Sequence, residues 1–219
     1  MMRMLFPLLL TGCGGIGLAP AFDDTVMSEA ESMTDGLTGR TYAAWINDVV
    51  AVEPMGLGLA LADVEAAALL FHVVHADDAG MSLALTLSDA QGEQSTCEPV
   101  SELPSADWDN DSLVFYIQEG SFDLPVGGKP LTLFDLEMTG EIVDEGAGMS
   151  ATTLYAEIDT RDLNGRAFGD DVDVCIIVEQ LGSTCHPCPD GEVACTDLVL
   201  ELTPVEVDVS FDPGVSGGC

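Results

Sequence analysis

Three carboxylates at alternate positions make Asp107-Trp108-Asp109-Asn110-Asp111 a candidate site of chemistry. A hard cation such as calcium takes about six to eight oxygen ligands, and alternate residues of a loop can direct several oxygens to one point. We interpret the segment as an acidic loop. If the segment binds calcium, Asp107, Asp109 and Asp111 are the candidate ligands, and we expect no other cofactor.

The same spacing resembles the start of an EF-hand loop, D-x-D-x-D, but the likeness ends there. The sixth position is Ser112 instead of glycine, and the twelfth is Gln118 instead of glutamate. We therefore favour an exposed acidic turn that holds no cofactor, and a calcium site is the alternative. Asp170, Asp171 and Asp173 form a second, weaker candidate, and we expect Asp173 to point outward from a strand.

Two histidines, His72 and His75, are three residues apart. On a helix they would share a face and could hold a metal, whereas on a strand they would point to opposite sides. We expect a strand here, and therefore one packed and one exposed histidine.

The segment Cys185-His186-Pro187-Cys188 has the C-x-x-C spacing of redox and zinc sites. A thioredoxin-like motif should open a helix that follows a strand. Here the turn residues Pro189 to Gly191 follow instead, with Cys195 close behind. We predict structural disulfides that staple one loop, in preference to a redox pair or a zinc site.

Signatures of hydrolytic catalysis are lacking in the sequence. It contains no S-x-x-K, and its one G-x-S-x-G match, Gly214 to Gly218, is in the expected C-terminal tail and not between an expected strand and an expected helix, as a nucleophile elbow would be. Carboxylates are too numerous for an acid and a base to be identified. Any enzyme site would have to be assembled from separate loops, so we expect a protein that is not an enzyme.

The N-terminus predicts export. Arg3 precedes a short apolar stretch, and small residues precede Cys13, as in a secretory signal. The stretch is shorter than the roughly 20 apolar residues that span a bilayer. Leu10-Thr11-Gly12-Cys13 resembles the lipobox of bacterial lipoproteins. The resemblance implies that the signal is cut before Cys13, which then carries fatty acids, palmitate among them. Gly14 is not the aspartate that retains some lipoproteins in the inner membrane, so it implies the outer membrane, facing the periplasm or the exterior.

The cysteine count agrees with export. The chain has 7 cysteines, and removing Cys13 leaves an even number. In an exported protein these would form disulfides whose pairing the sequence leaves open. The candidates are Cys97, Cys175, Cys185, Cys188, Cys195 and Cys219.

The charge balance limits the partners. The chain has 39 Asp and Glu but only 5 Lys and Arg, for a formal charge of −34. Such a surface repels nucleic acid and anionic lipid headgroups. The expected contacts are therefore the membrane, through the N-terminal lipid, and an envelope protein or glycan.

Period-two alternation of apolar and polar residues predicts strands, each with one buried face. In the run 133–140 we expect Phe134, Leu136 and Met138 to face inward. Residues 113–117 are apolar throughout and indicate a central strand, and 60–74 favours a strand over a helix. The alternating runs are 81–90, 133–140, 151–160, 171–180 and 205–211.

The predicted fold class is all-β, a single antiparallel sandwich or barrel-like domain stapled by disulfides. The expected organisation is a signal peptide over 1–12, a flexible lipid-anchored tether over 13–40, a globular domain over 41–212 and a tail over 213–219. We expect a non-enzymatic binding or structural module of the cell envelope. The alternatives are a secreted hydrolase and a calcium-dependent binding module.

Overall fold

A computed structural model describes the chain from Gly36 onward, with short gaps. The described residues are 36–54, 68–77, 79–109, 112–126, 129–143, 146–163 and 172–218. The predicted signal, Cys13 and the tether as far as residue 35 lie outside them. So do three candidate ligands and one candidate disulfide residue, namely Asp111, Asp170, Asp171 and Cys219.

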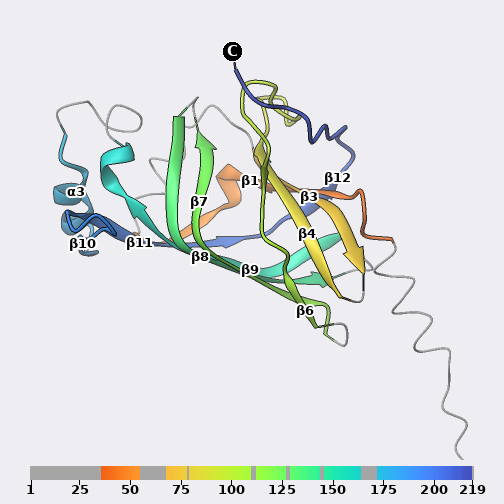
Figure 1. The fold of residues 1–219 in the computed structure, drawn as a ribbon, viewed down its shortest axis with the longest axis horizontal. Coiled ribbons are helices and arrows are strands. Elements are labelled where there is room, and N and C mark those ends of the chain that lie inside the picture. The colour runs from red at the N-terminus through yellow and green to blue at the C-terminus, as the bar shows by residue number, and fades with distance from the viewer. Residues whose placement is uncertain are drawn as a thin grey trace, which may run out of the picture.

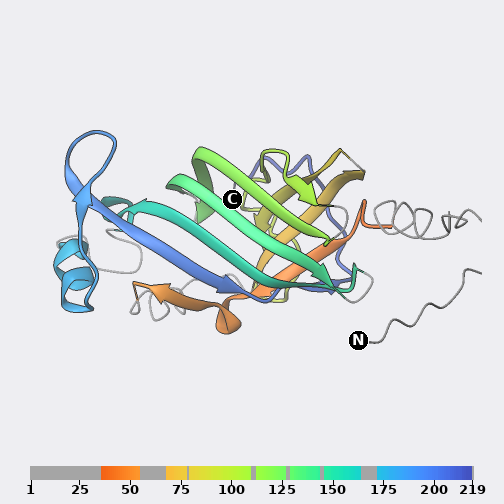
Figure 2. The ribbon, with the colours of Figure 1, turned by 90° about the horizontal axis from the view of Figure 1, so that it is seen from below.

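Antiparallel strands in one sheet make up most of the described chain, which confirms the all-β prediction (Figures 1 and 2). The strands are β1 (Thr41–Trp45), β2 (Val50–Glu53), β3 (Ala68–Asp77), β4 (Gly80–Leu87), β5 (Ser101–Glu102), β6 (Asp107–Asp109), β7 (Val114–Val126), β8 (Lys129–Val143), β9 (Gly148–Asp159), β10 (His186–Pro187), β11 (Val193–Leu202) and β12 (Val205–Val207). Short 3-10 turns, η1 (Ile46–Asp48) and η3 (Thr160–Leu163), follow β1 and β9.

The sheet returns on itself in a barrel-like way. Its order is β5-β4-β3-β1-β12-β9-β8-β7-β6, and the two end strands, β5 and β6, are consecutive in the chain. The segment that contains them pairs first with β4, ending in a bridge between Ala106 and Met81, and then with β7. One segment therefore joins the two ends of the sheet.

Inward side chains form one main core inside the curved sheet. Leu83 and Leu85 of β4, and Leu154 and Ile158 of β9, are buried there, on the faces that alternation predicted. A large apolar side chain contributes roughly 1.5–3 kcal/mol when it is fully buried. Leu37 is also part of this core, so the ordered body begins before Thr41.

A bulge in β8 shifts its alternation. Pairing between β8 and β9 changes register between Phe134 and Glu137, and Asp135 has a φ of 48°. As a result Leu133 and Leu136 are in the main core, whereas Phe134 packs on the other side against a small cluster around a disulfide. The predicted inward orientation of Phe134 is therefore wrong, while that of Leu136 and Met138 is confirmed.

A second bulge affects the two histidines of β3. The register against β4 shifts between Val73 and His75, so that His72 pairs with Ala84 and His75 with Ser82. Both partners are on the outer face of β4, opposite the leucines of the core. The strand and the burial pattern, with His72 half-buried and His75 exposed, are as predicted. The expectation that the two side chains point to opposite faces is wrong.

Residues 174–180, most of the run 171–180, form a helix instead of the predicted strand. The helix α3 (Val174–Gln180) begins at Asp173, whose side chain accepts a hydrogen bond from the Cys175 N–H at 3.0 Å. Its buried residues, Val174 and Val178, have the four-residue spacing of a helical face. Asp173 is therefore an N-cap and not an outward strand residue. Among the described residues, no helix is long and apolar enough to cross a membrane.

The C-terminal segment covers part of the sheet. Val207, the last residue of β12, and Val209 after it pack on a small cluster of residues from β1 and β3. The Phe211 ring stacks on His72 with 4.2 Å between the ring centroids. The alternation over 205–211 therefore marks a contact face outside the main core.

The chain then runs beside the loop that precedes β5 (Figure 1). The Gln94 side-chain amide makes two hydrogen bonds with the backbone of Asp212. It donates to the Asp212 carbonyl at 2.9 Å and accepts from the Asp212 N–H at 2.6 Å. The Gly218 N–H donates to the Cys97 carbonyl at 3.1 Å.

Candidate functional site

Two of the three predicted calcium ligands are on β6, an end strand of the sheet. Asp107 and Asp109 are exposed and belong to β6, paired with Tyr116 and Val114 of β7, so residues 107–109 form a strand and not the expected loop. They are two residues apart and therefore share a face. Asp109 accepts a hydrogen bond from the Ser112 hydroxyl at 2.7 Å. Asp111, the third predicted ligand, is outside the described residues.

The predicted disulfide cysteines are oxidised wherever the structure describes them. Cys185 is bonded to Cys175 of α3, and Cys188 to Cys195 of β11. The two cysteines of the C-x-x-C motif thus have different partners, as expected for structural crosslinks. Cys97 is also disulfide-bonded.

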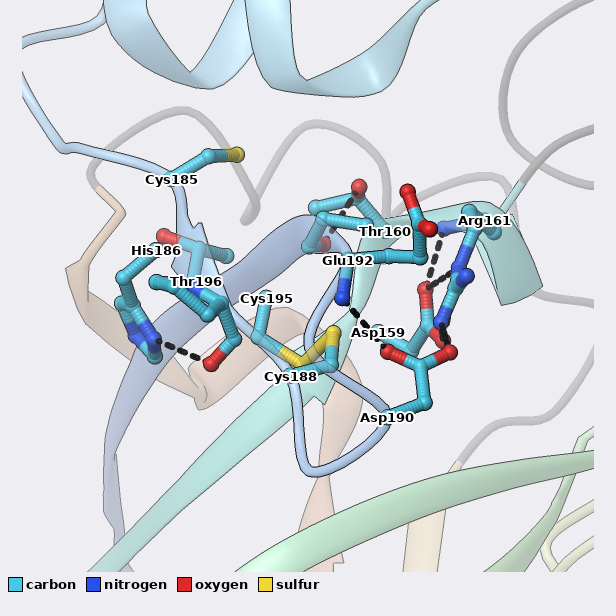
Figure 3. The surroundings of a disulfide bond; sticks show 12 residues. Asp159, Thr160, Arg161, Cys185, His186, Cys188, Asp190, Glu192, Cys195 and Thr196 are labelled. Carbon is cyan, nitrogen blue, oxygen red and sulfur yellow. Dashed lines mark hydrogen bonds and ion pairs between the residues drawn. A yellow bond between two sulfur atoms is a disulfide. The ribbon is translucent and has the colours of Figure 1, made fainter.

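His186 is held between these two crosslinks. It belongs to β10, which pairs with the start of β11 so that His186 is opposite Cys195. The residue before it, Cys185, is in one disulfide, and Cys188, two residues after it, is in the other. Figure 3 shows His186 beside the Cys188–Cys195 bond. The backbone around this imidazole is therefore fixed by covalent bonds on both sides.

Arg161 and its two aspartate partners, Asp159 and Asp190, form an arginine clamp that also holds the loop between Cys188 and Cys195. Arg161 of η3 is hydrogen-bonded to Asp159, which is largely buried, and its Nη2 is 2.7 Å from an oxygen of Asp190 in the Cys188–Cys195 loop. The bond to Asp159 first, and that to Asp190 second, raise the pKa of Arg161. The Glu192 N–H and then Arg161 hold the pKa of Asp190 below its usual value. In Figure 3 the disulfide stands between this clamp and His186.

Two carboxylates face each other next to His186. In the pairing of β9 with β11, Glu157 is directly opposite Asp197. Their neighbours Ala156, Ile158 and Leu198 are buried in the core, so both carboxylates are on the outer face. Like charges directly opposite each other on adjacent strands destabilise a sheet. The register therefore places a concentrated negative charge at this point.

Glu157, His186 and Asp197 form a compact donor cluster. One ligand atom from each, a carboxylate oxygen or an imidazole nitrogen, lies within 4.8 Å of the others. The His186 Nε2 atom is 3.4 Å from an oxygen of Asp197, which is within ion-pair range. That contact does not have hydrogen-bond geometry, and Nε2 is buried and makes no hydrogen bond. These donor types are ones that proteins use to hold divalent metal ions.

The sequence identified part of this site. His186 was singled out by its place in the C-x-x-C segment, and the alternation in 151–160 put Glu157 on an outward face. Asp197 was missed, because only the register of β9 against β11 brings it opposite Glu157. The other two histidines are elsewhere, with His72 bonded to Thr41 and His75 to Asp77.

The chain matches no protein-family model, no curated protein and no solved structure to a significant degree. The site must therefore be interpreted from its own geometry.

Proposed function

We propose that the protein is an exported, lipid-anchored binding module of the cell envelope. The observation that carries the proposal is the state of the cysteines. Each one in the described residues, from Cys97 to Cys195, is disulfide-bonded. Disulfides of this kind persist in oxidising compartments outside the cytosol. The signal-like N-terminus and the lipobox-like Leu10-Thr11-Gly12-Cys13 agree with a location outside the cytosol.

Lipid at Cys13 is the proposed anchor. Two or more acyl chains hold a protein stably on a membrane, at about 0.8 kcal/mol for each buried methylene, whereas one chain holds it only marginally. The extreme negative charge of the chain would otherwise repel it from anionic lipid headgroups.

Replacing the proposed acceptor tests the anchor. Cys13→Ser should move the protein from the membrane pellet to the soluble fraction, and Gly14→Ala should leave it in the pellet as a matched control. Intact-mass measurement of the wild type should find an acylated Cys13 as the first residue. A wild type without fatty acid, or a Cys13→Ser protein that stays in the pellet, would overturn the proposed anchor.

The binding role is tested with the folded, full-length protein as bait. The native protein should capture a specific glycan or protein from its own envelope. The same protein, reduced and alkylated at its cysteines, should lose that capture, because its loops are no longer held. Equal capture by both forms would mean that the folded surface is not what binds.

A further inference from the structure

We infer that Glu157, His186 and Asp197 bind one divalent transition-metal ion of the zinc class on the outer face of the sheet. Their ligand atoms converge within 4.8 Å, from β9, β10 and β11. The inference concerns the folded body alone and stands whether or not Cys13 carries lipid. The thiols of the C-x-x-C segment are used in disulfides and take no part in this site.

The orientation of His186 is that of a metal ligand. Its Nδ1 is 3.4 Å from the Pro187 carbonyl, which can only accept a hydrogen bond, so in the metal-binding state that we infer Nδ1 carries the proton. This leaves the lone pair on Nε2, the nitrogen that faces Asp197 and makes no hydrogen bond. A ring nitrogen directed to a backbone carbonyl, with the other directed to the ion, is the usual arrangement of a metal-binding histidine.

A bound cation would also reduce the repulsion between Glu157 and Asp197. The register holds Glu157 directly opposite Asp197, and the chain carries a formal charge of −34, so their repulsion has little compensation. Arg161, the nearby cation in Figure 3, is engaged by Asp159 and Asp190 instead. A divalent ion between the carboxylates would change the repulsion into attraction.

The distances suit a small ion after a modest adjustment. Ligand atoms of a tetrahedral zinc ion are about 3.3 Å apart, as expected from zinc–ligand bonds of about 2.0 Å. The His186–Asp197 pair already has this separation, at 3.4 Å. The side chain of Asp197 is 62% exposed and free to rotate, whereas His186 is fixed between two crosslinks.

The donor set favours zinc over calcium. Calcium needs about six to eight oxygen ligands, while one imidazole and two carboxylates match the mixed nitrogen and oxygen set of zinc sites with three protein ligands. Such sites keep a fourth position for water or an outside ligand. Because Asp197 is exposed, that position would face solvent.

The test is a zinc titration of the full-length, disulfide-intact protein by calorimetry. It is run at neutral pH and about 0.15 M salt, with calcium in excess to occupy non-specific acidic sites. We expect one zinc ion per chain. His186→Gln should weaken zinc binding by more than about tenfold, and Glu157→Gln and Asp197→Asn should each weaken it as well. His75→Gln, which alters an exposed histidine beside Asp77, is the matched control and should bind zinc like the wild type.

Thermal unfolding separates a ligand from a folding residue. Zinc should raise the melting temperature of the wild type and of His75→Gln, but not that of His186→Gln. If His186 only neutralised the two carboxylates as a cation, zinc would not bind in excess calcium. The inference is overturned by that result, or by a folded His186→Gln protein that binds zinc as tightly as the wild type.

Discussion

At the scale of single residues, Gly140 of β8 marks a point where the core has no room. A Cβ at this position would be 2.6 Å from the Phe115 ring and 2.9 Å from the Thr152 hydroxyl. Phe115 is fully buried and cannot move aside without disturbing the core. Gly140→Ala should therefore lower the free energy of unfolding by about 1–3 kcal/mol, measured by urea denaturation.

Gly120 of β7 provides the matched control for Gly140. It is exposed, and a Cβ added there would meet nothing within 4 Å. Gly120→Ala should change the free energy of unfolding by no more than about 0.5 kcal/mol. Equal effects of the two substitutions would show that backbone entropy, and not the contact with Phe115, governs both positions.

Residue types predicted which side chains could do chemistry, but not which of them meet. His186 and the outward Glu157 were visible in the sequence as separate features. Their association with Asp197 depends on strand register, which acts between segments about 40 residues apart. Nothing in the local spacing of carboxylates encodes that register, because the acids are spread along the whole chain.

At the scale of elements, alternation predicted strands well wherever pairing is regular. It placed Leu83 and Leu85 of β4, and Leu154 and Ile158 of β9, correctly in the core. It was wrong at bulges, because one extra residue reverses the side chains that follow, as at His75.

The period-two alternation also predicted the wrong element at α3, because tertiary contacts decide the structure there. A helix of seven residues is too short to be stable alone, so a cap, a disulfide and a buried face must hold it.

The cap of α3 can be tested directly. Asp173→Ala removes the acceptor for the Cys175 N–H and should cost about 1 kcal/mol. Amide exchange across Val174–Gln180 should become faster, since this short helix loses one of its three supports. Asp208→Ala removes the same charge from an exposed position after β12 and should leave that exchange unchanged. Unchanged exchange in Asp173→Ala would assign the stability of α3 to the disulfide and its buried valines.

At the scale of the whole molecule, closure of the sheet stabilises the folded state, whereas the acidic surface destabilises it. The segment from β5 to β6 joins the two ends of the sheet, and the Gln94–Asp212 contacts hold the C-terminal segment beside the loop that precedes β5. Against this, the net charge of −34 gives a self-repulsion that favours expansion. Among the described residues, the ion pairs of Arg40 with Glu206 and of Arg161 with Asp159 and Asp190 offset this repulsion only at their own positions.

Salt should therefore stabilise the protein. Raising sodium chloride from about 0.01 M to about 0.15 M shortens the Debye length from about 30 Å to about 8 Å, which screens charges across the whole surface. The melting temperature should rise over this range and level off above it. Potassium chloride should act equally, because screening depends on ionic strength. The double variant Glu201→Gln/Asp208→Asn, which removes two exposed charges, should melt higher at low salt and respond less to added salt. A melting temperature that is independent of salt would mean that the sheet and its crosslinks dominate, and that the acidic surface costs little stability.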